Sequence, residues 1–393
     1  MGQSIPYNEK SRCFIMNILV FGEEHIRNKI TYYHDIIKRK HGCNYYYYAD
    51  DRTGLSVKVE NFIKAPAIKR TITGYIMFLI YIYRAIEIIR EKQIDIVEIY
   101  VGINNKIIYI FECILKIFYK KIPIIHYARG EQYYYDKGKG KDETLRKIFE
   151  LADLVFIKEG EEIFEKYGVR LKKTLPLCNS VPIKEDIARE NAESKDNVVL
   201  YLNSFKEFRR IELLVEAFGL VKSNSIRDCK LVLVGLLDRF SEESQFYQNI
   251  SQYERKILKM IDLSQHKDSI SCLPFTTDPE RIKQFFLNAK VFCLPSELVY
   301  CNYSLLEALS YGVPCIVTND VDRRAEEIVS HAVNGLLAKP NPGSIADSIV
   351  KLIDSDKYYE ICRAAQKTIY EKYNIERNAE IIYSMYKEIT KIY

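Results

Sequence analysis

The sequence predicts an α/β protein built from two doubly wound domains, and three observations support this fold class. A chain of 393 residues is too long for one ordinary core and fits two domains of roughly 150–200 residues. Its hydrophobic fraction of 48% and charged fraction of 28% are typical of soluble globular proteins. Short apolar runs alternate with longer helix-like segments along both halves, which indicates parallel sheets with helices on both faces.

The first half opens with a short extension, residues 1–15, before the first apolar run. A run ending in glycine, NILVFG, predicts the first strand, and a polar stretch after it predicts a helix. Tyr45–Tyr48 is the one low-complexity run. The predicted strands of this half are 17–22, 94–101, 122–127 and 151–158, and the predicted helices are 27–40 and 105–120.

The second half repeats the alternation. Its predicted strands are 197–202, 229–236, 269–273, 291–294 and 315–318, with a helix at 210–221 and an amphipathic final helix at 373–393. Two prolines, Pro176 and Pro182, interrupt the periodic pattern between the halves. The predicted domains are therefore 1–178 and 179–372, followed by the helix 373–393.

Charge and cysteine content exclude several classes of function. The formal net charge of +5 comes without the block of Lys and Arg that nucleic-acid binding requires. The ten cysteines form no CxxC pair, which favours buried reduced thiols and argues against a zinc site. No secretory signal is evident, and the longest apolar stretch, 75–83, is too short to span a membrane. These observations predict a cytoplasmic protein without a metal.

The segment from Pro295 to Thr318, PSELVYCNYSLLEALSYGVPCIVT, is the most informative one for function. It predicts a strand end, an irregular stretch, a short helix and another strand. Ser304 and Glu307 have the spacing of a capping box that starts the helix, and Gly312 with Pro314 ends it. A helix that begins just after a strand end offers backbone amides and a positive dipole to a phosphate.

This segment resembles the signature of retaining nucleotide-sugar glycosyltransferases of family 4 (group 1). Pro295 and Ser296 after the strand, Glu307-Ala308, and the Gly312-Val313-Pro314 turn all fall in the family's pattern. Four further stretches resemble family elements in the same order: Asn179-Ser180-Val181, LLVEAF from Leu213, LVLVG from Leu231, and EIVSHAVNGLL from Glu327. The final helix resembles the one that family members return across the amino-terminal domain.

The resemblance implies a GT-B fold, two Rossmann-like domains facing each other across a cleft. The second domain would bind a nucleoside diphosphate sugar, UDP-linked by expectation, and the first would bind the acceptor. No metal or other cofactor is required. Glu307 would accept the ribose hydroxyls, and the amides around Tyr303, Ser304 and Leu305 would face the diphosphate. Arg209 stands at the family's usual Lys position, and Lys206 substitutes for its Arg.

Three departures from the family pattern leave alternatives open. Val299 stands where the first family glutamate belongs, and the nearest carboxylate is Glu297, which either replaces that glutamate as a catalytic residue or faces water. Arg129-Gly130 stands for the usual His-Gly. Arg129 is thus either a catalytic residue or a structural partner of Glu131. His126 is either a cleft residue or a strand histidine whose hydrogen bonds are made within the protein. Gly22 ends the first strand without the glycine-rich loop of the family, and it is assigned to the acceptor cleft.

The predicted activity is that of a bacterial-type hexosyltransferase. It moves a hexose to a hydroxyl of a glycan or lipid-linked acceptor, with retention, in cell-surface polysaccharide or glycoconjugate synthesis. Peripheral contact with the inner membrane face, through the basic helix Lys106–Lys121, is an alternative to burial of that helix. Two other functions stay open, a nucleotide-sugar-binding protein that has lost catalysis and a nucleotide-sugar epimerase of the same fold. Asp320-Val321-Asp322 is interpreted as a loop.

Overall fold

The computed structural model describes the greater part of the chain as two compact units. The first unit comprises residues 1–178 and 376–393, and the second comprises 179–375; each is described by itself. The described residues are 15–22, 30–49, 59–66, 72–100, 105–128, 143–158, 161–166, 168–184, 196–224, 226, 228–236, 250–297, 299, 301–319 and 324–391.

The first unit is built on a seven-stranded sheet in which every pair of neighbouring strands is parallel. The strand order is β3-β2-β1-β4-β5-β6-β7, so the order reverses between β1 and β4. The strands are β1 (Asn17–Phe21), β2 (Asn44–Ala49), β3 (Phe62–Lys64), β4 (Ile96–Tyr100), β5 (Ile124–Ala128), β6 (Leu154–Ile157) and β7 (Thr174–Pro176).

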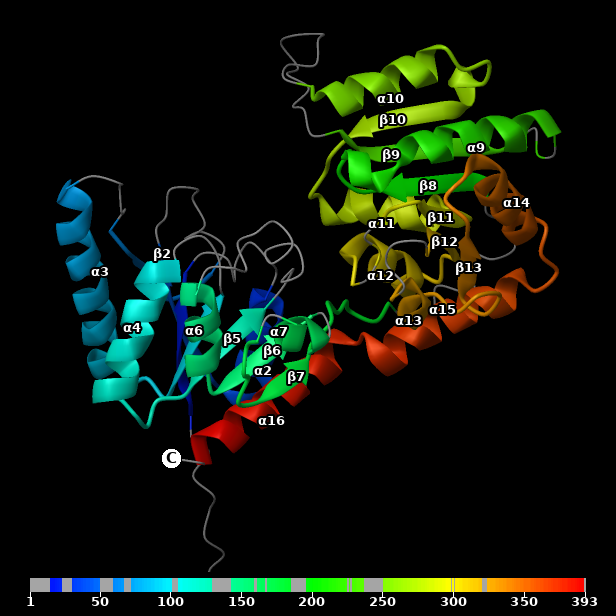
Figure 1. The fold of residues 1–393 in the computed structure, drawn as a ribbon. Helices are drawn as coiled ribbons and strands as arrows, with labels where there is room; N and C mark the ends of the chain where they lie inside the picture. The colour runs from blue at the N-terminus through cyan, green and yellow to red at the C-terminus, as the bar shows by residue number, and fades with distance from the viewer. Residues whose placement is uncertain are drawn as a thin grey trace, which may run out of the picture. The chain divides into compact units, whose positions relative to one another are not determined.

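Three helices cover one face of this sheet (Figure 1). These are α3 (Ile72–Glu91), α4 (Asn105–Phe118) and α6 (Glu143–Leu151). Their apolar sides form one core with the sheet, in which Phe111 of α4 stacks on Phe21 of β1 with ring centroids 4.5 Å apart. The unit also contains α2 (Thr31–His41) and α7 (Glu162–Lys166).

The tyrosine run that the sequence presents as low-complexity is the strand β2. Its side chains alternate between the two faces, as in any strand. The Tyr45 ring stacks on His34 of α2, with centroids 4.2 Å apart. The Tyr48 hydroxyl donates to the Tyr81 carbonyl of α3 (2.9 Å). The run is therefore a core element, and its interpretation as low-complexity sequence is wrong.

The last helix, α16 (Ile375–Lys391), packs on the first unit along most of its length. The buried Tyr386 hydroxyl donates to Glu98 of β4, which also accepts from the Tyr127 hydroxyl (3.1 Å). Nearer the helix start, Tyr383 stacks on His41 with centroids 3.7 Å apart. A helix far along the chain thus completes the polar core of the amino-terminal sheet.

The second unit is built on a six-stranded parallel sheet with the order β10-β9-β8-β11-β12-β13. Its strands are β8 (Val198–Leu202), β9 (Lys230–Leu236), β10 (Ile270–Pro274), β11 (Val291–Leu294), β12 (Cys315–Thr318) and β13 (Gly335–Ala338). The prediction of two doubly wound domains is confirmed. The sequence analysis missed β2, β3 and β7 in the first unit and β13 in the second.

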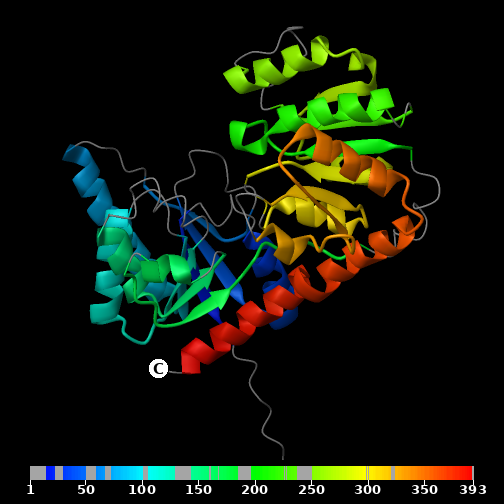
Figure 2. The same cartoon turned by 45° about the vertical axis from the view of Figure 1, so that its right-hand side comes forward.

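Helices link the strands of the second unit, and α14 packs against α9 (Figures 1 and 2). The helical segments are η3 (Glu207–Arg209), α9 (Ile211–Asn224), α10 (Gln252–Asp262), η4 (Lys267–Ser269), α11 (Pro279–Asn288), α12 (Tyr303–Ser310), α13 (Ala325–Ile328), α14 (Pro342–Ile353) and α15 (Tyr358–Lys372). No helix among the described residues has both the length and the apolarity that crossing a bilayer needs.

The cysteines depart in part from the sequence expectation. Seven described cysteines are free thiols, most of them buried. Cys178 and Cys301 each form part of a disulfide, so the expectation of thiols throughout is wrong for these two.

Candidate functional site

The strand order of the second unit marks one place on its sheet for a ligand. The order reverses between β8 and β11, which are neighbours in the sheet. In open parallel sheets, ligands bind outside the carboxyl ends of the strands at such a reversal. The residues that follow β8 and β11 are therefore the candidates, and they include Arg209 and Glu297 from the sequence analysis.

Arg209 lies at the end of η3 and reaches the segment that follows β11. Its Nη1 donates to Ser296 Oγ (3.0 Å), and its guanidinium lies over the Phe208 ring, 4.7 Å from the centroid. Ser296 is fully buried and donates from Oγ to the Phe208 carbonyl (3.3 Å). Burial lowers the pKa of Arg209, but an arginine stays protonated in proteins. The edge of the sheet thus holds a fixed cation.

Arg210 is a site residue that the sequence analysis missed. It has φ 51°, in the left-handed region, and its Nε and Nη2 donate to Glu297 Oε1 (3.2 and 3.0 Å). The Glu297 amide in turn donates to the Phe208 carbonyl (2.9 Å). Glu297 is therefore held at the end of β11 by an ion pair. The sequence signal for Arg210 was its position next to Arg209. Nothing in the spacing distinguishes such a residue from an arginine exposed to solvent.

The N-cap of helix α12 lies two residues before the predicted one, Ser304. Its N-cap is Asn302, whose Oδ1 accepts from the Leu305 amide (3.2 Å). The prediction that Ser304 and Glu307 form the capping box is wrong, because Ser304 already lies inside the helix. The Leu305 amide is occupied by the cap, so it is not available to a diphosphate as predicted. The amides of Tyr303 and Ser304 remain at the helix start.

Two asparagines from distant parts of the sequence fix this helix start. Asn203, after β8, donates from Nδ2 to Asn302 Oδ1 (3.3 Å). Asn179, buried at the start of the unit, donates to the carbonyl of Cys301, the residue before the cap. Gly235 of β9 has φ 143°, and a Cβ there would lie 1.8 Å from the Asn203 carbonyl oxygen. Only glycine lets β9 approach the loop so closely.

Lys206, Glu307 and Val299 take different positions around this edge. Lys206 is exposed; its carbonyl accepts from the Arg209 amide (2.8 Å), and its side chain has no hydrogen bond or ion pair with any described residue. Glu307 is half-buried in α12, and its charge contributes, after burial, to a raised pKa of Tyr311. Val299 is fully buried, so the position of the first family glutamate faces the interior and not the edge.

The residues proposed for the acceptor side lie in the first unit. Gly22 follows β1 with φ 98° and donates its amide to the Tyr48 carbonyl (3.0 Å). It therefore lies at the carboxyl edge, beside the reversal between β1 and β4. Arg129 falls outside the described residues, as does the Asp320-Val321-Asp322 loop.

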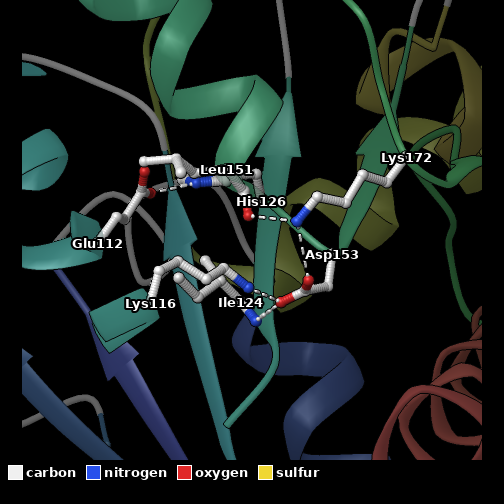
Figure 3. A network of polar contacts seen from close by, with 7 residues as sticks. All are labelled: Glu112, Lys116, Ile124, His126, Leu151, Asp153 and Lys172. Carbon is white, nitrogen blue, oxygen red and sulfur yellow. Dashed lines mark hydrogen bonds and ion pairs between the residues drawn. The ribbon is translucent and has the colours of Figure 1, made fainter. Parts of the chain in front are cut away.

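His126 lies inside the first unit and not at its edge. Its side chain is fully buried, and Nε2 hydrogen-bonds to Oε1 of the equally buried Glu112 of α4 (Figure 3). Burial raises the pKa of Glu112. Below this pair in Figure 3, Asp153 accepts from Lys172 (3.1 Å), from the Ile124 amide (2.8 Å) and from Lys116. The prediction that His126 contacts an acceptor is wrong in this structure, because no ligand reaches a fully buried ring.

Metal binding receives no support from the described part of the chain. No group of three or more His, Cys, Asp or Glu side chains there is arranged to hold a metal ion.

Comparison with known proteins shows that the second unit is similar to a protein family. Residues 182–369 match the family model of glycosyl transferases group 1. The match lies entirely within the second unit. Among curated relatives, an N-acetyl-alpha-D-glucosaminyl L-malate synthase from Bacillus anthracis is 21% identical over 198 residues. That match covers 50% of this chain and 46% of the relative, so it spans about half of each.

Solved structures extend the likeness in fold to both units. HepE from Anabaena, solved with UDP and glucose, aligns over 95% of this chain and 100% of its own, with a TM-score of 0.68 and 16% identity. A sucrose-phosphate synthase from Thermosynechococcus elongatus aligns over 96% and 100%, with a TM-score of 0.69 and 15% identity. Each unit thus has the parallel sheet and alternating helices of the GT-B fold, as predicted.

Proposed function

We propose that this protein is a retaining glycosyltransferase that takes a hexose from a UDP-linked donor and transfers it to a hydroxyl group. The donor would bind at the carboxyl edge of β8 and β11 in the second unit. Support comes from the group 1 domain and from structural neighbours such as the Anabaena protein, which was solved with UDP and glucose. The acceptor would be a glycan or a lipid-linked glycan in cell-surface polysaccharide or glycoconjugate synthesis.

One observation carries the proposal: a partly buried arginine and a helix start converge at the strand-order reversal. Arg209 is tied to Ser296 after β11, and the loop after β8 is tied to the cap of α12 through Asn203. A diphosphate between them would accept from Arg209 and from the Ser304 amide. Lys206 is exposed on the same loop and would supply a second cation.

This arrangement suits the charge that develops in sugar transfer. The bond from the anomeric carbon to the diphosphate breaks, and its electron pair leaves with the nucleoside diphosphate. Fixed cations and amides aimed at that oxygen stabilise the transition state more than the ground state. With retention, the acceptor hydroxyl attacks from the face of the leaving phosphate, whose oxygen takes the hydroxyl proton. No covalent enzyme intermediate, metal or further cofactor is needed in this scheme.

Two carboxylates would hold the donor's sugar units. Glu307, half-buried in α12, would accept from the ribose hydroxyls. Glu297 would contact the transferred hexose in place of the missing first glutamate, and Arg210 would hold its carboxylate in position. On the acceptor side we retain Arg129 and Gly22 as proposals, with peripheral contact at a membrane face.

A binding protein without catalysis is the second candidate, and one observation favours it. Val299 occupies the place of the first family glutamate and is fully buried, so that position presents no carboxylate to a sugar. Whether Glu297 replaces it decides between transfer and binding alone.

The test is to incubate the full-length protein with a panel of nucleotide sugars, with and without sugar and lipid-linked acceptors. Acceptor-dependent release of nucleoside diphosphate supports transfer, and NMR of the product should show the anomeric configuration of the donor. Donor binding in calorimetry without turnover for any acceptor would instead identify a binding protein. A changed sugar on an intact nucleotide would identify an epimerase and overturn the proposal.

A further inference from the structure

Helix α3 of the first unit carries apolar side chains on its outer face as well as on its core face. Ile76, Leu79, Ile80 and Tyr83 are 60%, 65%, 47% and 65% exposed. Their spacing of three and four residues places them in one stripe. The opposite side of the same helix packs into the core through Tyr81, Ala85 and other buried residues. We call these four exposed side chains the α3 stripe.

The α3 stripe is too concentrated to be ordinary scatter of surface hydrophobics. Isolated exposed apolar residues are common, whereas a contiguous patch of several hundred Å² marks an interaction site. Four side chains of this size expose on the order of 400 Å², about half of the ~800 Å² that each partner of a stable protein interface buries. The α3 stripe alone is thus too small for a stable dimer.

The stripe ends abruptly along the helix. Further toward the carboxyl end, the same face carries Glu87 and Arg90, and Arg84 Nη1 donates to Glu87 Oε2 (2.7 Å). Among the described side chains of the outer face, the apolar part therefore extends from Ile76 to Tyr83 and stops there. A helix with this division would bury two turns in an apolar phase and keep the rest in water.

The charge around the stripe is positive. Among the described residues from 72 to 123, the exposed cations are Arg84, Arg90, Lys92, Lys106, Lys120 and Lys121, and the one exposed carboxylate is Glu91. Arg90 donates to the Tyr119 hydroxyl (2.6 Å), which ties the end of α3 to the end of α4. There Ile117 and Phe118 are also exposed, next to Lys120. Apolar side chains flanked by Lys and Arg match an anionic bilayer surface.

We propose that the α3 stripe docks the first unit on an anionic lipid bilayer. The apolar side chains enter the boundary between headgroups and acyl chains, and the cations of α3 and α4 lie over the lipid phosphates. α3 stands at the edge of the first unit in both ribbon views (Figures 1 and 2), where no other described helix of that unit covers it. This deepens the membrane contact of the proposed function, yet it does not depend on sugar transfer.

The test is flotation of the full-length protein with vesicles of phosphatidylcholine, alone or mixed with phosphatidylglycerol. The test variant is Leu79→Ser with Tyr83→Ser. The matched control is Leu263→Ser with Tyr370→Ser, which removes the same two residue types at 75% and 65% exposure from the second unit. Thermal melts and UDP binding, measured on each variant, verify folding.

Wild type and control should float with the mixed vesicles and much less with phosphatidylcholine alone, and binding should weaken as salt is raised. The Leu79/Tyr83 variant should bind at least about tenfold more weakly, since two large apolar side chains no longer enter the lipid. Equal binding of the variant and wild type, or no binding of wild type to either vesicle, would overturn the proposal. So would self-association in sedimentation that only this variant abolishes, because the stripe would then serve a second copy. UDP binding and sugar transfer are scored separately, so their failure would not be mistaken for failure of docking.

Discussion

The polar cluster at the edge of the second unit and the polar pair inside the first contain similar side chains but differ in what they can reach. Arg209 and Glu297 follow β8 and β11 and lie at the carboxyl edge of their sheet. His126 is the third of five residues in β5, and it points into the helical layer, where it meets Glu112. Position along a strand of a parallel sheet thus separates the two cases. Residues that follow the strand end form a potential ligand site, and a residue in mid-strand makes a structural contact.

The two clusters also differ in how their charges are satisfied. Arg209 hydrogen-bonds to a hydroxyl at the edge of its sheet, whereas Glu112 faces a histidine in a dry interior. Glu112 Oε2 and His126 Nδ1 have no hydrogen-bond partner among the described residues. The first cluster should therefore govern binding and the second stability. The predictions below test this division, beginning with the largest effect.

Arg209→Ala should weaken UDP binding by about 1.5–3 kcal/mol, the usual contribution of a hydrogen bond to a charged group. Calorimetry on the full-length protein measures it. The matched control is Arg363→Ala, an exposed arginine on α15, which should leave UDP affinity unchanged. Similar losses in both variants would mean that general charge, and not the edge cluster, attracts the nucleotide.

Glu307→Ala should weaken binding of the UDP sugar by about 1–3 kcal/mol, because the ribose hydroxyls lose their acceptor. Glu307→Gln keeps one acceptor oxygen and should recover part of the loss. The assignment fails if calorimetry gives the wild-type affinity for the alanine variant.

Arg210 and Glu297 should behave as a coupled pair in turnover. Each alanine substitution should lower kcat, and the double substitution should cost less than the sum by about 1–2 kcal/mol, as for residues in direct contact. Arg210→Lys should rescue only in part, since lysine lacks the forked donors. Strict additivity of the two substitutions in kcat would show that Arg210 does not position Glu297.

Glu112→Gln should change stability and its pH dependence without changing UDP affinity. The pKa of Glu112 is raised in the folded protein, so its contribution to stability is present below its unfolded pKa and is lost as pH rises through the folded value. Glutamine does not ionise. The melting temperature of the variant relative to that of wild type should therefore rise by roughly a few degrees as the pH is raised from acidic to neutral. A constant difference across that range would contradict the burial argument.

The sequence was informative where function depends on local spacing. The position of Arg209 is set by its place between the strand β8 and the helix α9, which contains Ala217. Ser296 is located in the same way, because it comes directly after the end of β11. The prediction of two doubly wound domains needed only the alternation of apolar runs.

The sequence was uninformative where distant contacts decide between local options. Asn302 and Ser304 are both good N-caps. The choice of Asn302 depends on a hydrogen bond to it from Asn203, 99 residues away, and on one from Asn179 to Cys301, 122 residues away. Likewise, the orientation of His126 depends on the register of β5, and the Tyr45–Tyr48 run becomes a strand only because α2 and α3 cover its two faces. Pairings of this kind are not encoded in spacing.

A crystal structure of the full-length protein with UDP tests the central claim most directly. We expect the diphosphate oxygens within hydrogen-bond distance of the Arg209 guanidinium and of the Ser304 amide. A diphosphate bound elsewhere, beyond hydrogen-bond distance of Arg209 and of the Ser304 amide, would contradict the assignment of the donor site.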